Sequence, residues 1–239
     1  MDTRRAHYLD VMGIQRWQRC DAEPAAMNNS VGVAAADMQR AIPASNRDSE
    51  NAAIARLDWH ALQEQVAQCP RCPELVANRT QTVFGVGNHH TDWLVIGEAP
   101  GAEEDQQGEP FVGRAGQLLN AMLLAIGLKR EQVFIANILK CRPPNNRDPK
   151  PEEAANCAPY LQRQIALIQP KIILAVGRVA AQNLLQTGTP IGKLRGQVHS
   201  YGNIPLVVTY HPAYLLRTPS DKRKAWEDLK LARSLMAAS

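Results

Sequence analysis

The sequence predicts an α/β fold, arranged as three layers, with a mostly parallel four-stranded sheet between two layers of helices. Short apolar runs alternate along the chain with segments of helical spacing. Such continuous apolar runs are typical of parallel strands buried on both faces. Of the 239 residues, 45% are hydrophobic and 21% charged, which suffices for a sizeable core and excludes wholesale disorder.

The first half of this domain contributes two helices and one strand. Helical spacing begins near Asp58 and runs to Gln68. Residues 93–96 (WLVI) form an apolar run that ends at Gly97, which predicts a strand. Residues 116–126 are helical, because Leu118, Leu119, Met122 and Leu123 recur on one side.

The second half repeats the alternation without an internal sequence repeat. Residues 133–139 predict a second strand, and Pro151 with two following glutamates starts a helix that reaches Ile168. Residues 172–176 (IILAV) predict a third strand, followed by a helix from Arg178. The last expected elements are a strand at 206–209, a loop and a helix at 222–236.

The N-terminal fifty residues differ from the rest of the chain. They hold six basic and seven acidic residues, whereas residues 51–239 hold 21 and 16. Alanine is frequent and bulky apolar residues are sparse after Trp17, so residues 21–54 are expected to form a flexible linker. We therefore divide the chain into a short apolar motif at 1–20, this linker, and a domain at 55–239.

The composition excludes some functions and permits others. No run of about 18 uncharged apolar residues occurs, and the N-terminus has no apolar signal region, so we expect a cytoplasmic protein without a membrane partner. The net charge of +4 is a mild basic bias that permits a nucleic-acid partner without proving one.

Polar residues follow three of the expected strands. They are Gly97-Glu98-Ala99-Pro100-Gly101, Asn137 with Lys140-Cys141-Arg142, and the segment 211–217 (HPAYLLR). Because ligands bind at the carboxyl ends of parallel strands, the fold implies that these segments converge on one site.

The cysteines indicate a metal site. Cys69 and Cys72 form a CxxC pair with prolines that stiffen the loop, Cys141 follows after 68 residues, and Cys157 after 15 more. Four thiolates suit either tetrahedral zinc or a [4Fe–4S] cluster, and the spacing alone does not separate the two. The alternative is four unrelated buried cysteines, and Cys20 is expected to be a bystander.

Three long motifs give the chain a family resemblance over residues 55–239. Segments 97–119 (GEAPGAEEDQQGEPFVGRAGQLL), 137–144 (NILKCRPP) and 211–217, with the cysteine set, resemble the family 4 uracil-DNA glycosylases. The resemblance implies their fold, a structural [4Fe–4S] cluster on the four cysteines, and hydrolysis of deoxyuridine to an abasic site during base excision repair. The competing interpretation is a non-catalytic, metal-stabilised DNA-binding module associated with replication.

The resemblance also implies a pocket for a flipped base. Phe111 would stack on uracil, the Asn137 amide would read O4 and N3–H, and Glu104 would exclude thymine by filling the space beside C5. Gly97 and Ala99 would line the pocket. Without the motifs, Phe111 would be read as a core aromatic, Asn137 as a strand-end amide and Glu104 as a solvated acid.

The chemistry is expected to rest on His211 and Glu98. By resemblance, His211 would donate a hydrogen bond to O2 of the departing uracil anion; otherwise it would be a core histidine. The best-known uracil glycosylases position water with an aspartate, where this chain has Ala99. Either the Glu98 carboxylate activates water or the backbone of 97–101 binds it. The sequence lacks the basic, histidine-containing loop of a branch that bonds covalently to its product, so ordinary hydrolysis is expected.

DNA contacts are expected from residues 214–217, with Tyr214, Leu215 and Leu216 as an apolar wedge and Arg217 on a phosphate. Basic residues near the second motif (Lys140, Arg142, Arg147) and at 222–224 would add a positive surface, so salt should weaken binding. We expect a monomer acting on single- or double-stranded DNA.

The N-terminal segment 3–17 (TRRAHYLDVMGIQRW) is similar to the N-terminal peptide of the bacterial DNA polymerase III psi subunit, which docks on the clamp-loader complex. The resemblance implies a bacterial, nucleoid-associated protein tethered to replication. The docking residues would be Arg4, Arg5, Leu9, Ile14 and Trp17. The alternative is a frayed start with an incidental tryptophan.

Overall fold

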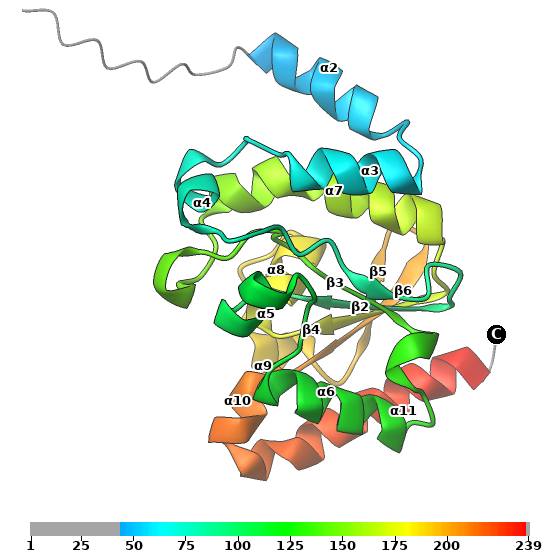
Figure 1. Cartoon of the computed structure of the whole chain (residues 1–239). Coiled ribbons are helices and arrows are strands. Elements are labelled where there is room, and N and C mark those ends of the chain that lie inside the picture. The colour runs from blue at the N-terminus through cyan, green and yellow to red at the C-terminus, as the bar shows by residue number, and fades with distance from the viewer. Residues whose placement is uncertain (1–43, 238–239) are drawn as a thin grey trace, which may run out of the picture. The chain divides into compact units, whose positions relative to one another are not determined.

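The structure is a computed structural model that describes residues 44–237 (Figure 1). The expected docking residues Arg4, Arg5, Leu9, Ile14 and Trp17 lie outside the described residues, as do Cys20 and the first part of the expected linker. Among the described residues, no helix is both long and apolar enough to cross a membrane.

The sheet has six strands rather than the expected four, in the order β1-β3-β2-β4-β6-β5. The four expected strands are its centre and pair in parallel: β3 (Phe134–Asn137), β2 (Trp93–Gly97), β4 (Ile172–Val176) and β6 (Ile204–Thr209). The short edge strands β1 (Val86–Gly87) and β5 (Val198–Tyr201) pair antiparallel to β3 and β6.

The two edge strands escape prediction because they lack the apolar signal of buried strands. β1 has only two residues, and β5 (VHSY) alternates between exposed and half-buried positions. A tight hairpin turn joins β5 to β6, and Gly202 in that turn has a φ of 56°.

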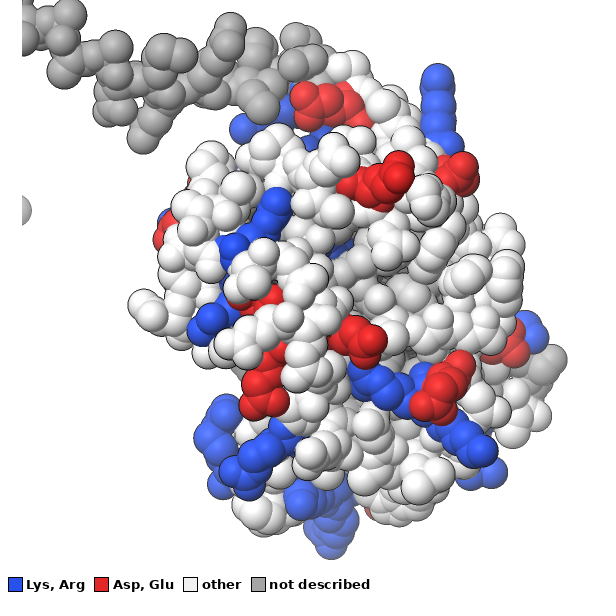
Figure 2. Space-filling view, in the orientation of Figure 1, with Lys and Arg blue, Asp and Glu red and all other residues white. Residues whose placement is uncertain are grey.

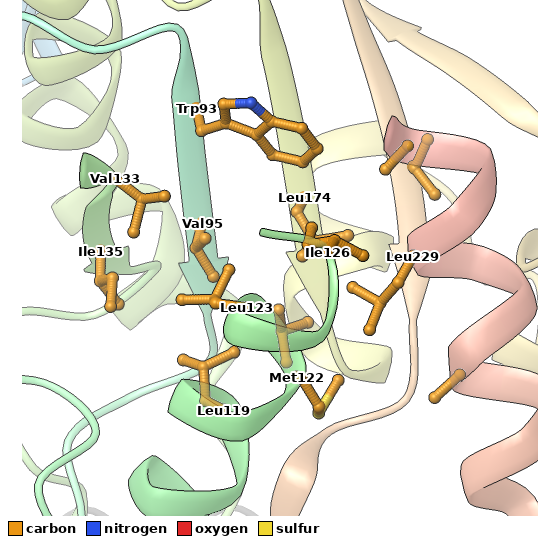
Figure 3. Close-up of a cluster of buried hydrophobic side chains, with 14 of the residues drawn as sticks. Trp93, Val95, Leu119, Met122, Leu123, Ile126, Val133, Ile135, Leu174 and Leu229 are labelled. Atoms are coloured by element: carbon orange, nitrogen blue, oxygen red, sulfur yellow. The ribbon is translucent and has the colours of Figure 1, made fainter. Parts of the chain in front are cut away.

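Helices cover both faces of the sheet, which confirms the predicted three-layer architecture. On one face, α6 (Arg114–Ala125) and α11 (Lys222–Ala237) pack against alternate strand residues such as Val95 and Leu174 (Figure 3). On the other face, α7 (Pro151–Ile168) and α8 (Arg178–Leu185) pack against the intervening residues, such as Leu94 and Ile173. Each central strand is therefore buried on both sides.

Several helix bounds follow the sequence signals. α7 has Pro151 at its first position, and its bounds are those expected. α3 (Trp59–Ala67) is capped by Asp58, whose carboxylate accepts the N–H of Ala61 at 2.8 Å. The sequence did not predict the short elements α4 (Pro73–Asn78), α5 (Ala102–Gln107), α9 (Ile191–Leu194), α10 (Pro212–Arg217) and the 3₁₀ turns Arg130–Gln132, Pro144–Asn146 and Pro219–Asp221.

The expected linker at 21–54 is wrong at its C-terminal end, because residues 44–54 form helix α2 (Ala44–Ile54). Ile54 is buried in a cluster with residues of α3 and α7. Arg71 donates to the side chains of Asn51 at 2.9 Å and Glu50 at 3.2 Å. A segment of low hydrophobicity thus becomes helical through one apolar anchor and polar contacts, which composition does not reveal.

Candidate functional site

One cavity of about 800 Å³ lies at the carboxyl ends of the central strands. The predicted residues Glu98, Ala99, Glu104, Phe111, Asn137, His211, Tyr214 and Arg217 all line it. The three polar segments therefore meet at one cavity through Glu98, Asn137 and His211, whereas Gly97 and Arg142 do not line it, and Lys140 and Cys141 line a separate cavity.

Gly97, at the end of β2, lets two of these side chains meet. A Cβ atom at Gly97 would lie 2.5 Å from Asn137 Oδ1 and 2.6 Å from Phe111 Cζ. Asn137 is 2% exposed, and its Oδ1 has no hydrogen-bond partner among the described residues. A buried acceptor without a partner is costly. The wall of the cavity therefore holds an amide ready to accept a ligand's N–H.

Phe111 lies in a loop with an unusual backbone. Its φ of 56° is in the left-handed region, which is uncommon for a bulky residue. Its ring is buried and lies 5.5 Å from the His211 ring, with 30° between the planes. The ring therefore forms a fixed aromatic surface beside the histidine.

The Glu104 carboxylate holds this loop to the first motif. One oxygen accepts the N–H of Gly101 at 3.1 Å, and the other accepts those of Val112 at 3.0 Å and Gly113 at 3.4 Å. Glu104 lines the cavity, but its oxygens are already engaged with backbone. The structure thus gives its carboxylate a bracing role that the sequence did not predict.

His211 is neutral, with a defined tautomer. Burial lowers its pKa to about 4, the charge of Arg217 acts in the same direction, and Glu104 opposes both. Nδ1 accepts the N–H of Ala213 at 3.2 Å, so the ring hydrogen lies on Nε2. Gly177, with a φ of 101°, leaves room for this ring, because a Cβ there would lie 3.0 Å from His211 Cβ.

Glu98 lines the same cavity, and its pKa is shifted in the opposite direction. Burial raises its pKa to about 7, the negative charge of Asp148 adds to this, and Arg178 lowers it. Asp148 and Arg178 form an ion pair at 2.5 Å and also line the cavity. A carboxyl group with a pKa near neutrality is suited to exchange a proton with a water molecule.

The expected DNA-contacting residues divide into accessible and buried ones. Arg217 is exposed and Tyr214 and Leu216 are half-buried, whereas Leu215 is 1% exposed and packs in the core, so it is not available to DNA. The Tyr214 hydroxyl donates to Asp221 at 2.6 Å. Helix α10 therefore exposes Arg217 and part of Tyr214 and Leu216, while Leu215 anchors the helix in the core.

The expected positive surface also changes. Lys140 is 1% exposed and donates to the Asn137 carbonyl at 3.0 Å and to Gln164 Oε1 at 2.6 Å, so it cannot meet DNA. Arg147 is held by Glu153 and Glu74. The other expected basic residues, Arg217 and those at 222–224, are exposed. Lys and Arg side chains gather at the lower left of Figure 2, over α10 and the start of α11 in Figure 1.

The four expected metal ligands line one small cavity between α4, α7 and the segment after β3. Cys141 Sγ accepts from Arg79 at 3.0 Å, Cys157 Sγ from the Lys140 backbone N–H at 3.3 Å, and Cys72 Sγ from Asn156 at 3.7 Å. Burial raises the pKa of Cys72, Cys141 and Cys157, the last to about 12. In residues 44–237, no group of three or more His, Cys, Asp or Glu side chains is arranged to hold a metal ion.

Sequence reasoning missed several residues around the larger cavity. Gly177 and Arg178 follow β4, the one central strand whose end carried no noted motif. Asp148 comes from the loop before α7, and Tyr210 precedes His211. The glycine directly after a buried strand was a usable signal for the first pair, whereas nothing local marked Asp148 as a neighbour of Glu98.

Comparisons with known proteins agree with this site. The sequence model of the uracil DNA glycosylase superfamily matches residues 84–230. A type 4 uracil-DNA glycosylase of Archaeoglobus fulgidus is 45% identical over 174 residues, which are 70% of this chain and 87% of that protein. The type 4 enzyme of Thermotoga maritima is 44% identical, covering 73% and 93%. A type 5 enzyme of Thermus thermophilus is 29% identical, covering 54% and 73%. The chain therefore belongs to the uracil-DNA glycosylase superfamily and, within it, to the type 4 enzymes.

Proposed function

We propose that this chain flips deoxyuridine out of DNA and hydrolyses its N-glycosidic bond, releasing uracil and leaving an abasic site for base excision repair. The observation that carries this function is the buried Asn137 Oδ1, which lacks a partner among the described residues and lies at the cavity that Phe111 and His211 also line. As a member of its family, the chain is a hydrolase acting on N-glycosyl bonds.

The Asn137 amide is complementary to uracil. Its oxygen would accept the N3–H of the base, and its nitrogen would donate to O4. Cytosine has no hydrogen on N3 and carries an amino group instead of O4, so the same amide would face an acceptor with its oxygen and a donor with its nitrogen. Phe111 would stack on the flipped base and orient it in the cavity.

His211 would stabilise the leaving group. Uracil departs as an anion with charge on O2, and a positioned donor there lowers the barrier. Because Nδ1 is engaged with Ala213, the hydrogen on Nε2 is the one available for O2. A neutral donor keeps its proton after the base has left, so His211 would act by charge stabilisation rather than by proton transfer.

Glu98 would activate the water that adds to C1′. Its carboxyl lies in the wall of the same cavity, and its pKa of about 7 suits a general base. The Asp148–Arg178 pair would tune that acidity through the charges that face it. We further propose that Glu104 excludes thymine indirectly, through the loop that its carboxylate braces.

We further propose that the four cysteines hold a structural [4Fe–4S] cluster; the support is their shared cavity and their chemistry, since no ligand arrangement is preformed in residues 44–237. Four sulfurs line one cavity, and three of them accept hydrogen bonds from N–H groups, as cluster thiolates do. Burial raises the pKa of Cys72, Cys141 and Cys157, and a bound cationic centre would favour their thiolate forms. Cys69, Cys72, Cys141 and Cys157 would hold the group. The bound cluster would cross-link α4, α7 and the segment after β3. Zinc is the competing metal.

We also propose that residues 1–20 dock on the DNA polymerase III clamp loader and place the enzyme near newly made DNA, in the nucleoid. The support is the similarity of residues 3–17 to the psi-subunit peptide. A peptide of residues 1–25 should bind purified clamp loader, and Trp17→Ala should abolish binding. If the intact peptide does not bind, the docking proposal fails without affecting the catalytic one.

An Asn137→Ala variant tests the proposed function directly. Purified variant and wild type are incubated with a uracil-containing oligonucleotide, and abasic sites are cleaved with alkali. Loss of the amide should lower single-turnover excision by about a hundredfold, because both base contacts disappear. The matched control Asn203→Ala, in the exposed β5–β6 turn, should excise at the wild-type rate. Equal excision rates of the two variants would show that Asn137 does not recognise the base.

A further inference from the structure

The aromatic surface of the cavity is built on a backbone that needs support. Phe111 is one of five non-glycine residues with positive φ in residues 44–237, and it is the one aromatic residue among them. Bulky residues adopt this conformation only where their surroundings impose it. The groups that hold the Phe111 backbone therefore decide where its ring lies.

Arg130, in the 3₁₀ turn before β3, contacts this loop from outside the cavity. Its Nη2 donates to the Pro110 carbonyl at 2.5 Å, and its Nη1 donates to the Phe111 carbonyl at 3.2 Å. Nη1 also donates to Asn120 Oδ1 on α6 at 3.2 Å. One guanidinium thus connects two successive carbonyls of the strained loop to a helix.

This contact complements the Glu104 brace. Arg130 binds the carbonyls of residues 110 and 111, while Glu104 binds the N–H groups of residues 112 and 113. Two side chains of opposite charge therefore hold the backbone before and after Phe111 in the chain. Charged groups make the stronger hydrogen bonds to backbone, and the planar guanidinium can reach two carbonyls at once.

Packing restricts the same carbonyl. A Cβ atom at Gly116 would lie 1.8 Å from the Phe111 oxygen, so the start of α6 closely approaches it. Arg130 is half-buried, and burial lowers the pKa of its guanidinium, while Glu109, Glu131 and Glu104 oppose this effect. The cation is therefore held by two carbonyls and the Asn120 side chain, in the field of three carboxylates.

We propose that Arg130 is a positioning residue for uracil excision, acting by holding the Pro110 and Phe111 carbonyls so that the Phe111 ring stays in place to stack on the flipped base. Arg130 does not line the cavity, so it acts through Phe111. The inference rests on the proposed role of Phe111 as the stacking surface.

The first test compares Arg130→Met and Arg130→Lys with the exposed control Arg233→Lys. Single-turnover excision is measured at saturating uracil oligonucleotide, and affinity is measured with an oligonucleotide that carries a tetrahydrofuran abasic analogue. The methionine variant should excise roughly ten- to a hundredfold more slowly, since small displacements of an orienting group have effects of this size. The lysine variant should lose less, because it keeps the charge but cannot span both carbonyls.

Affinity for the abasic analogue separates positioning from general damage. That ligand has no base to stack, so all three variants should bind it within about twofold of wild type. A parallel loss of excision and of abasic-site affinity would overturn the inference, as would an unchanged excision rate. If the methionine variant does not fold, the lysine variant decides by the same two measurements.

A double-mutant cycle with Phe111→Ala tests whether Arg130 acts through Phe111. In the Phe111→Ala background, Arg130→Met should cause little further loss. If Phe111→Ala is impaired and the two losses multiply, the Arg130 inference is wrong while the stacking role stands. If Phe111→Ala excises at the wild-type rate, the proposed stacking role fails, and the inference fails with it.

Discussion

At the scale of single residues, burial shifts the pKa values of two ionisable groups that line the cavity in opposite directions. It lowers the pKa of His211 to about 4 and raises that of Glu98 to about 7. Between these values both side chains are uncharged, and above about 7 the cavity holds a neutral imidazole and a carboxylate. Such a divergence separates a hydrogen-bond donor from a base.

The pH dependence of excision follows from these values. The single-turnover rate of the wild-type enzyme should rise about tenfold per pH unit below pH 7 and level off above it, because Glu98 must lose its proton to act as a base. Titration of His211 should not alter the excision rate above about pH 5, because its imidazole is already neutral there. A rate independent of pH between 5.5 and 8.5 would contradict the role of Glu98.

The relative importance of the two residues can be ranked. Glu98→Gln should retain more single-turnover activity than His211→Asn, because water can be bound by the backbone of the first motif, whereas His211 is the proposed donor to the anion on O2. Losses of about 10²-fold and 10³-fold are expected. Equal losses in the two variants would overturn this order.

Glu98 should also lower the free energy of unfolding at neutral pH. Its pKa in the folded state is about 7 against an ordinary 4.5, so the folded state holds more protons between these values and the unfolding free energy falls as pH rises. At pH 8 the Glu98→Gln variant should therefore have a higher free energy of unfolding, and a higher melting temperature, than wild type. The difference in free energy is at most about 1.4 kcal/mol for each pH unit between the two pKa values. The gain should vanish at pH 4, and the exposed control Glu64→Gln should show none.

Residue identities were more predictable than residue contacts. Asn137, Phe111 and His211 could be found because each stands in a long motif whose type fits one step of the chemistry. The engagement of Glu104 with three backbone N–H groups and the burial of Lys140 could not, because both depend on loops distant in sequence meeting in the fold.

At the scale of elements, the tight end of β2 is the feature most sensitive to a small change. Gly97→Ala would place a methyl group 2.5 Å from Asn137 Oδ1 and 2.6 Å from Phe111 Cζ. Excision should fall at least about a hundredfold, because both base-orienting groups must shift. The control Gly192→Ala, whose added Cβ meets nothing within 4 Å, should leave the rate unchanged. A Gly97→Ala variant as active as this control would show that the two side chains tolerate displacement.

The α10 helix should carry part of the electrostatic attraction for DNA. Arg217→Ala should weaken binding to a uracil oligonucleotide and reduce the slope of log affinity against log salt by about 0.7 to 0.9. The control Lys171→Ala removes an exposed charge just before β4, at the end of that strand opposite to its carboxyl end. An identical slope for both variants would place Arg217 away from the phosphates.

The elements themselves divide by the strength of their signal. The central strands and α7 were predictable because continuous apolar runs and a proline with two acids are local features. β1, β5 and α2 were not, since a two-residue strand, a half-exposed edge and an alanine-rich helix owe their order to neighbours.

At the scale of the whole molecule, the four cysteines come from segments that are far apart in sequence and line one cavity, where the proposed cluster would join them. Cys141→Ser should lower the melting temperature by several degrees or more and remove the iron–sulfur absorption band, because a ligand lost from a structural metal site weakens every segment that the site connects. Cys20→Ser should retain both properties. A zinc content with no visible absorption in the wild-type protein would replace the cluster by the competing metal.

The assembly of the site could be predicted only in outline. Parallel strands end at one edge of a sheet, and this rule alone places Glu98, Asn137 and His211 near one another. The supporting contacts of Asp148 and Arg130 follow only from the folded chain, because these residues come from a loop and a turn that carry no motif of their own.

The most direct test of the whole account is the excision of one base from matched oligonucleotides. Three oligonucleotides, identical except for uracil, cytosine or thymine at one position, are incubated with the full chain in single- and double-stranded form and then treated with alkali. We predict strand breaks at uracil and none at the other two bases, with wild-type activity lost in His211→Asn. Intact uracil oligonucleotide after prolonged incubation with metal-replete protein, or equal cleavage at all three bases, would contradict the account.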